Sequence, residues 1–463
     1  MKTNFFYSLL FLVIIGVSCS KSNNSPDPDG GGGGGGKSPI ASNGDIRGVI
    51  NSDIHLTKDK VYRLRGYVYV ATGATITIDP GTKIISNKDS AGVLVIYRGA
   101  KIMARGTASE PIVFTSGEAS PEPGDLGGIV LAGQAPGNSN HKVIEGGVDA
   151  AFSAFGGTDP HDNSGVLKYV RIEYAGKAVA VGDEVNGLSL YGVGDGTEID
   201  YVQVVRGLDD AYEFFGGTVN CKHLIAYNCA DDDFDMDDGY TGKIQFAISV
   251  KDPKFTDAKP DGDVSNNFEI DNVNPSNGFL LTRSPITFPV MSNFTAIGPN
   301  DNQNTNFGWG MRWRRGCKFI LANSVVIGGQ DGGLRLQEDS TIQYYVRGVS
   351  SFYNSYVGAL KNVVDVEANK TLTPPFTYDL NSITALITGR DKSTLVTDNA
   401  VLKLADPFNN TKPGLQPQSG SPLLTGALFD FSALTDSFFE KVAYKGALDG
   451  TNDWTSGWTV WGK

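Results

Sequence analysis

The chain has 463 residues, of which 40% are hydrophobic and 19% are charged, a composition typical of a globular protein with a large core. Its 39 basic and 51 acidic side chains give a formal net charge of −12. This acidic balance excludes a nucleic acid or an anionic membrane surface as a partner that is held by general electrostatics.

The N-terminus has the pattern of an export signal. After a lysine at position 2, an apolar run extends from Phe5 to Val17, and small residues precede Cys19. This run is too short to span a bilayer and is typical of a cleaved secretory signal. The segment before the cysteine resembles the lipobox of bacterial lipoproteins, which implies a signal peptide at 1–18 and a lipid such as palmitate on Cys19. An ordinary signal peptide with an incidental cysteine is the alternative.

Residues 19–44 are predicted to form a flexible tether. Ser, Asn, Pro and Asp dominate this segment, and Gly30 to Gly36 form an unbroken glycine run. Such a composition cannot bury enough apolar surface to order itself. We therefore expect a protein that is lipid-anchored to the outer membrane at the cell surface and that contacts the membrane only through its anchor. No later segment is long and apolar enough for a transmembrane helix.

Residues 45–348 have the pattern of a β-solenoid. Short runs rich in β-branched residues alternate with turns that contain Gly, Asp-Pro or Ser-Asn, and helical periodicity is almost absent. Two acidic segments, 209–217 and 231–239, repeat each other and start 22 residues apart. A self-match of this period is typical of a solenoid, because each repeat buries its apolar face against the next copy. We predict an all-β fold, a right-handed parallel β-helix over residues 45–348.

One strand of each repeat follows the pattern small, apolar, variable, apolar, and its variable residue should point outward. Two spacings in the resulting column, 34 and 43 residues, exceed one coil. They predict either excursions at 251–266 and 272–306 or a further coil that the pattern does not reveal. Coils lie ~4.8 Å apart, so acidic members of the column would stack on one another, and a cation, a proton or solvent must offset their repulsion. The column consists of Ser189, Glu213, Asp235, Glu269, Arg312 and Arg335.

The acidic repeats are candidates for a calcium site, because hard cations prefer six to eight oxygen ligands. The segment Asp233-x-Asp235-x-Asp237 starts like an EF-hand loop, but Asp238 and Ile244 occupy the positions that need Gly and Glu. The site would instead span two stacked coils. A solvated acidic face with turn-capping aspartates is the alternative. The candidate ligands are Asp209, Asp210, Glu213, Asp231, Asp232 and Asp235.

A glycan-degrading hydrolase or lyase is the alternative to a binding protein, since β-helices often carry such enzymes. The Asp209-Asp210 pair is similar to the paired aspartates of polygalacturonases, and Glu213 and Asp235 would be the further catalytic carboxylates. The Gly-His-Gly and Arg-Ile-Lys signatures of that family are missing. We expect His223 to be a packed strand residue, and the other histidines are too scattered to indicate a zinc cluster. We therefore favour a non-enzymatic protein and keep the glycan-degrading enzyme as the alternative.

The basic segment that ends the outward column is a second candidate surface. Trp309, Arg312 and Arg335 combine guanidinium and aromatic groups that suit acidic sugars, other carboxylates or a partner protein. The alternative is that the aromatic residues fill the core while the arginines pair with acids.

Residues 349–463 are predicted to form an irregular cap, because the repeat fades and a solenoid needs its last coil covered. We expect Trp454, Trp458 and Trp461 to pack this cap, with carbohydrate stacking on exposed tryptophans as the alternative. Three cysteines besides Cys19 are an odd number for a disulfide framework, so we expect them to be buried free thiols. They are Cys221, Cys229 and Cys317.

Several segments resemble exported parallel β-helix lipoproteins of Bacteroidota, and the resemblance covers about residues 47–463. The segments are Gly106–Ser116, Gly124–Ile129, Ser164–Tyr174, the two acidic repeats, Ser421-Pro422, Phe438–Val442, Tyr444–Ala447 and Asp453–Thr459. The family has no established activity to carry over, but its members often accompany TonB-dependent outer-membrane receptors. The resemblance therefore implies a cell-surface binding or accessory protein for a glycan, a nutrient or such a receptor.

Overall fold

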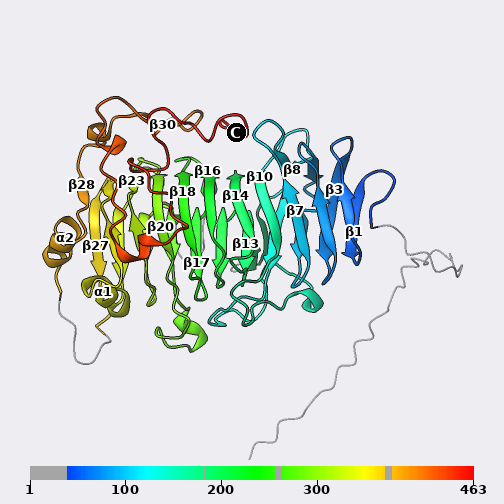
Figure 1. The fold of residues 1–463 in the computed structure, drawn as a ribbon, viewed down its shortest axis with the longest axis horizontal. Helices are drawn as coiled ribbons and strands as arrows, with labels where there is room; N and C mark the ends of the chain where they lie inside the picture. The colour runs from blue at the N-terminus through cyan, green and yellow to red at the C-terminus, as the bar shows by residue number, and fades with distance from the viewer. Residues whose placement is uncertain (1–38, 181–182, 257–262, 371–377) are drawn as a thin grey trace, which may run out of the picture. The chain divides into compact units, whose positions relative to one another are not determined.

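The computed structural model describes residues 39–180, 183–256, 263–370 and 378–463. In these residues 26 strands belong to one hydrogen-bonded sheet, and successive strands of a face pair in parallel. Figure 1 shows these strands following one another along one axis, from β1 (Asp45–Ile50) to β28 (Thr394–Val396). The fold is a parallel β-helix, which confirms the predicted fold class.

The predicted signal peptide at 1–18, Cys19 and the tether up to residue 38 lie outside the described residues. An antiparallel bridge joins Ile40 to Ile46, at the start of the described chain. Residues 39–44, the last part of the predicted tether, therefore lie beside the first strand.

The strands form three faces. Face 1 consists of β6 (Gly92–Ile96), β9 (Leu126–Ala132), β13 (Leu188–Tyr191), β15 (Tyr212–Phe215), β17 (Phe234–Asp237), β19 (Phe268–Ile270), β21 (Trp309–Trp313), β24 (Gly332–Gln337) and β27 (Asn362–Glu367). Face 2 starts with β2 (Ile54–Leu56), β4 (Thr75–Ile78) and β7 (Lys101–Arg105) and ends with β22 (Ile320–Ala322) and β25 (Ser351–Tyr353). Face 3 starts with β5 (Lys83–Ser86) and β8 (Ile112–Ser116) and ends with β23 (Val325–Gly329), β26 (Tyr356–Ala359) and β28.

Longer strands bend from one face to the next. The strands that cross from face 2 to face 3 are β10 (Gly165–Glu173), β14 (Glu198–Val205), β16 (Cys221–Tyr227), β18 (Lys243–Val250) and β20 (Val290–Ile297). At the N-terminal end, β1 and β3 (Val61–Val70) cross from face 3 to face 1.

The remaining elements lie outside the main sheet. Two antiparallel pairs are β11 (Lys177–Ala180) with β12 (Asp183–Val185) and β29 (Leu404–Asp406) with β30 (Gly414–Pro417). The helices are α1 (Asp339–Val346) and α2 (Leu380–Thr388), with short 3-10 turns at Ala150–Phe152, Pro275–Asn277, Asn399–Leu402, Pro422–Leu424 and Ser432–Thr435. Within the described ranges, no helix has both the length and the apolar character needed to cross a membrane.

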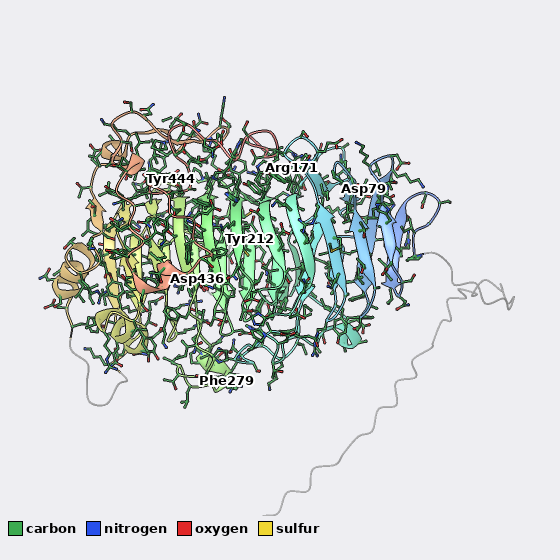
Figure 2. The ribbon with its side chains drawn as sticks, viewed as in Figure 1. Asp79, Arg171, Tyr212, Phe279, Asp436 and Tyr444 are labelled. Atoms are coloured by element: carbon green, nitrogen blue, oxygen red, sulfur yellow. The ribbon has the colours of Figure 1, made fainter. Side chains whose placement is uncertain are left out.

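Aromatic side chains stack inside face 1 and hold its coils in register. The rings of Tyr212 and Phe234 have centroids 5.3 Å apart, and those of Phe234 and Phe268 are 5.5 Å apart. The hydroxyl of Tyr212, which Figure 2 labels among the strands, donates to the carbonyl of Val202 at 2.7 Å. Successive side chains of a strand point to opposite sides of the sheet. The residues next to these stacked rings in each strand must therefore stack on the outer side of face 1.

The predicted outward column is confirmed residue by residue. Parallel pairing places Ser189 beside Glu213, and it continues in the same register to the end of the column. The further pairs are Glu213 with Asp235, Asp235 with Glu269, Glu269 with Arg312 and Arg312 with Arg335. The spacings of 34 and 43 residues are therefore excursions between neighbouring coils, since β17 pairs with β19 and β19 with β21.

A regular corner separates face 2 from face 3. Residues at this corner have left-handed backbone angles, with φ between 50° and 62°. In the early coils the rings of aromatic residues and a histidine stack at this corner. In the later coils asparagines occupy the same position. The corner residues are Tyr169, Tyr201, His223, Phe246, Asn293, Asn323 and Asn354.

The C-terminal segment 399–463, here called the strap, runs back along this corner. Asn354 and Asn323 donate to the carbonyls of Gly426 and Leu428 at 2.8 and 2.9 Å. Further along the strap, Asn293 donates to the carbonyl of Tyr444 at 3.0 Å. The order is thus reversed, with later strap residues on earlier coils. Figure 1 shows the chain end, marked C, above the strands of the N-terminal half.

The position of the tryptophans corrects the predicted cap. Trp454 packs against His223, with centroids 4.9 Å apart, and Trp458 packs against Tyr169 at 5.8 Å. Arg171, labelled in Figure 2, donates to the carbonyl of Trp458 at 2.8 Å. These rings cover the side of early coils rather than the last coil. The asparagines and aromatic residues of the corner give the strap a continuous surface to bind. The irregular sequence of the strap does not reveal where it binds.

The parallel pairing continues past residue 348, the predicted end of the β-helix. β25, β26, β27 and β28 add to all three faces, so the solenoid extends to about residue 396. These strands are short and are interrupted by helices, which hides their repeat. The last coil is covered by α2, whose Ile383 and Ile387 are fully buried in the main core.

A buried ion pair lies behind the second acidic repeat. The ammonium of Lys251 lies 3.1 Å from Asp233, and both side chains are at most 1% exposed. Ser249 and Asn267 also donate to the carboxylate of Asp233. The three predicted buried thiols, Cys221, Cys229 and Cys317, are free and buried as expected.

We predict that Lys251→Met lowers the free energy of unfolding by about 3–5 kcal/mol, because Asp233 is left as an uncompensated buried charge. Urea denaturation followed by circular dichroism measures the loss. The double variant Lys251→Met/Asp233→Asn should regain a large part of it, since the unpaired charge is removed. Equal stability of the single and double variants would contradict this role of the pair.

Candidate functional site

All six predicted metal ligands line one cavity of about 170 Å³ on face 1, here called the carboxylate pocket. The described part of its wall also contains residues from outside the two repeats. The predicted residues are Asp209, Asp210, Glu213, Asp231, Asp232 and Asp235. The additional residues are His141, Glu145, Glu184, Asn186 and Glu269.

The strand pattern explains why these carboxylates meet. In β15, Tyr212 and Phe214 are buried in the core while Glu213 between them points outward. In β17, the core residues Phe234 and Met236 flank Asp235 in the same way. Residues 209–210 and 231–232 precede these strands, so the turn carboxylates of both coils come to the same edge.

Part of the pocket wall has a structural role in joining coils. Asp210 accepts a hydrogen bond from the backbone N–H of Asp232 at 2.8 Å, and Asp232 accepts one from the N–H of Asn266. The amide oxygen of Asn266 then accepts from the N–H of Trp309 at 2.9 Å. These bonds join neighbouring coils and occupy one oxygen of Asp210 and one oxygen of Asp232.

Carboxylate oxygens from adjacent coils converge closely enough to share a cation. One oxygen each of Asp210, Glu213 and Asp235 lies within 4.8 Å of the others, and Asp232, Asp235 and Glu269 form a second such group. Calcium binds oxygens at ~2.3–2.6 Å, so ligands on opposite sides of one ion lie about 5 Å apart. Oδ1 of Asp235 is buried and has no hydrogen-bond partner within the described chain. This donor set fits a hard cation.

The pocket strongly disfavours uncompensated negative charge. Burial, reinforced by neighbouring carboxylates, raises the pKa of Asp210, Glu213 and Asp235 well above their ordinary values. The amide of Asn186 donates to Glu213, which opposes only part of this effect. A bound proton or a bound cation would remove the repulsion.

His141 reaches the acidic repeat from the loop between β9 and β10, a contact that the sequence patterns do not predict. Its Nδ1 lies 3.0 Å from Asp238, and its Nε2 lies 3.2 Å from Glu145. Burial opposes protonation of His141, but the hydrogen bond and charge of Asp238 raise its pKa to about 9. Burial and the charge of Asp238 raise the pKa of Asp237 to about 8. Sequence spacing could not reveal this contact, since 97 residues separate His141 from Asp238.

The predicted ligand-binding arginines are paired with acids. Arg312 donates to Asp263 at 2.6 Å and to Glu269 at 3.0 Å. The guanidinium of Arg335 lies 4.5 Å from the ring of Trp309 and also pairs with Glu367. Trp309 is only 7% exposed. The structure therefore agrees with the alternative account of this segment, in which aromatic residues are buried and arginines neutralise carboxylates.

His223 is packed, as expected. Its Nδ1 lies 2.8 Å from Asp200, and its ring stacks between Tyr201 and Phe246 at the corner of faces 2 and 3. It does not line the carboxylate pocket, which lies on face 1.

A model of the family described as "Pectate-lyase like beta helix domain" matches residues 48–399. This range includes the carboxylate pocket and ends where the strap begins. No curated protein and no solved structure matches the chain.

We predict that, without metal, the protein loses thermal stability as the pH rises from about 6 to 9. Protonated His141 contributes fully to stability below its ordinary pKa of 6.5. This contribution is lost as the pH rises from 6.5 through its raised pKa of about 9. The contribution of protonated Asp237 is likewise lost as the pH rises through about 8. Melting temperatures in EDTA measure the change. His141→Gln should flatten the profile, and an equal profile for both proteins would contradict the assignment.

Proposed function

Because the chain belongs to the pectate-lyase-like β-helix family, we propose that it is a cell-envelope protein that binds an acidic glycan at the carboxylate pocket, with calcium and without cleavage. The observation that carries the proposal is the convergence of one oxygen each of Asp210, Glu213 and Asp235 within 4.8 Å. One buried oxygen of Asp235 has no hydrogen-bond partner in the described chain. These residues come from two adjacent coils, so the folded β-helix brings them together without needing a ligand. The site is therefore built before binding.

Different residues of the pocket would bind the ion and limit the local negative charge. Asp210, Glu213 and Asp235 would hold the ion, and the arginine pair at Glu269 limits the negative charge on the next coil. A bound calcium ion would supply positive charge for the carboxylates of a glycan and open coordination positions for its oxygens.

The chemistry of the pocket argues against glycan cleavage. A lyase needs a base, and His141 is the only basic side chain in the described wall. Its pKa of about 9 keeps it protonated at neutral pH, and it is paired with Asp238 and Glu145. A family fold alone does not establish an activity, because many chemistries share one fold.

A hydrolase that uses two of Asp210, Glu213 and Asp235 as its catalytic carboxylates is also disfavoured. Two-carboxylate mechanisms need one group with a raised pKa and one that stays ionised. Burial raises the pKa of Asp210, Glu213 and Asp235 in the same direction. Their oxygens also lie closer together than the ~6.5–9.5 Å that an inverting enzyme requires.

Lipid attachment at Cys19 would place the protein at the outer membrane, with the glycine-rich segment as its tether. The lipobox and the resemblance to Bacteroidota lipoproteins support this location and suggest a TonB-dependent receptor as a partner. In this arrangement a surface protein captures an acidic glycan and presents it for uptake.

We predict that calcium raises the melting temperature of the purified protein relative to EGTA. An ion that binds only the folded state at 100 times its dissociation constant adds about 2.7 kcal/mol of stability. Glu213→Gln/Asp235→Asn should abolish this gain and should be more stable than the parent in EGTA, because it removes like-charge repulsion. The matched control is Glu122→Gln/Asp430→Asn, two exposed carboxylates that should leave the calcium effect unchanged.

Calorimetric titration with oligogalacturonate tests the glycan part of the proposal. Binding should require calcium and should be lost in Glu213→Gln/Asp235→Asn, with no new reducing ends and no unsaturated products. Absence of a calcium effect on stability would overturn the metal site. Product formation would overturn the binding function in favour of an enzyme.

The lipid anchor is tested separately. We predict that expression in a bacterial host with labelled palmitate gives a labelled, membrane-associated protein, and that Cys19→Ala abolishes both properties. Cys317→Ala is the matched control, because this thiol is buried in the fold. Equal labelling of the parent and Cys19→Ala would contradict lipidation at this residue.

A further inference from the structure

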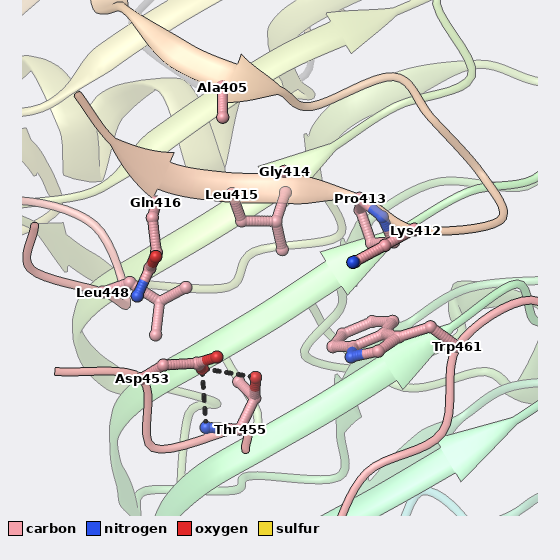
Figure 3. A pocket seen from close by; sticks show the side chains of 10 residues that line it. All are labelled: Ala405, Lys412, Pro413, Gly414, Leu415, Gln416, Leu448, Asp453, Thr455 and Trp461. Carbon is pink, nitrogen blue, oxygen red and sulfur yellow. Dashed lines mark hydrogen bonds between the residues drawn. The ribbon is translucent and has the colours of Figure 1, made fainter. Parts of the chain in front are cut away.

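A second cavity, of about 260 Å³, lies between the β29–β30 hairpin and the last part of the strap (Figure 3). The hairpin contributes Lys412, Leu415 and Gln416, and the end of the strap contributes Asp453 and Trp461. The cavity lies where the strap covers face 3 of the solenoid, whereas the carboxylate pocket lies on face 1. It is therefore a separate site.

The body of the β-helix holds both walls of this cavity in place. Tyr227, at the end of β16, packs edge-on against Trp461 with ring centroids 4.9 Å apart at 82°. Its hydroxyl accepts from the N–H of Gly462 at 2.8 Å and donates to the carbonyl of Asn410 on the hairpin side. One side chain thus ties the two strap segments together, and the indole of Trp461 is oriented before any ligand arrives.

Polar groups of both kinds face the cavity. Figure 3 shows Gln416 and Lys412 on one side, Asp453 with Thr455 on the other and Trp461 at one end. Within the described residues, Nε1 of Trp461, the amide of Gln416 and Nζ of Lys412 have no hydrogen-bond partner. One oxygen of Asp453 accepts from the N–H of Thr455 at 3.0 Å, and its other oxygen takes part in no hydrogen bond in the described chain.

We propose that this cavity is a calcium-independent binding site for a neutral pyranose unit of a glycan. Sugar hydroxyls both donate and accept, so they can pair with Asp453 and with the donors of Gln416, Lys412 and Trp461 together. The C–H groups of a pyranose ring can pack against the indole and the nearby Leu415, which lack polar groups on those faces.

Other ligand classes fit these residues less well. The carboxylate of Asp453 would repel a phosphate group or the carboxylate group of a uronate, because these anionic groups only accept hydrogen bonds at neutral pH. A purely apolar ligand would remove water from Gln416 and Lys412 without replacing their hydrogen bonds, which is costly. A hydroxyl-rich ligand avoids both penalties. The site goes beyond the function proposed for the carboxylate pocket, because it needs no cation and suits an uncharged sugar.

Tryptophan fluorescence of the purified protein in EGTA tests the proposal, with xylohexaose, cellohexaose, mannohexaose and galactohexaose as probes. We expect at least one probe to give a saturable change, and Trp461→Ala and Gln416→Ala to weaken its binding at least tenfold. Gln418→Ala, an exposed glutamine two residues away, is the matched control and should bind like the parent. Glu213→Gln/Asp235→Asn should also bind like the parent.

Three outcomes would overturn the site. They are the absence of a change with all four probes, unchanged binding in both Trp461→Ala and Gln416→Ala, and a requirement for calcium. The last would assign sugar binding to the carboxylate pocket. Gln416→Ala removes only a partly exposed side-chain amide, so the test stays decisive if Trp461→Ala fails to fold. Failure of the calcium experiments above would leave this site unaffected.

Discussion

The structure depends on the register in which one coil stacks on the next. Inside face 1 this register is held by the rings of Tyr212, Phe234 and Phe268, which lie one above another at 5.3 and 5.5 Å. A shift by one residue would exchange the inner and outer sides of every strand, so the buried stack permits a single arrangement. The outward residues Glu213 and Asp235 must then stack as well, although their charges repel.

The molecule offsets this repulsion with partners drawn from other coils. Behind the pocket, Lys251 neutralises Asp233 in a fully buried pair. Beside it, His141 is held between Asp238 and Glu145, and on the next coil arginines neutralise Glu269. Burial and neighbouring carboxylates raise the pKa values of Asp210, Glu213 and Asp235 well above their ordinary values, and there a cation has the most to contribute.

The strap binds a second repeating row of residues, at the corner between faces 2 and 3. Stacked rings in the early coils and asparagines in the later coils offer a continuous row of partners, and the strap binds it in reverse order. Because the strap is irregular, it can form features that a repeating coil cannot, such as the cavity beside Trp461. The protein thus separates a charged site on the solenoid from an uncharged site on its covering segment.

The sequence by itself determined the parallel β-helix, the outward column from Ser189 to Arg335 and the meeting of six carboxylates, because these follow from short-range alternation repeated at one coil length. Only the tertiary structure decided which distant segments cover the coils. The contact of His141 with Asp238, the pairing of Arg312 with Glu269 and the return of Trp458 to Tyr169 join residues that no local pattern relates. Repetition makes contacts between neighbouring coils readable in the sequence, whereas loops and the strap choose their partners by packing in three dimensions.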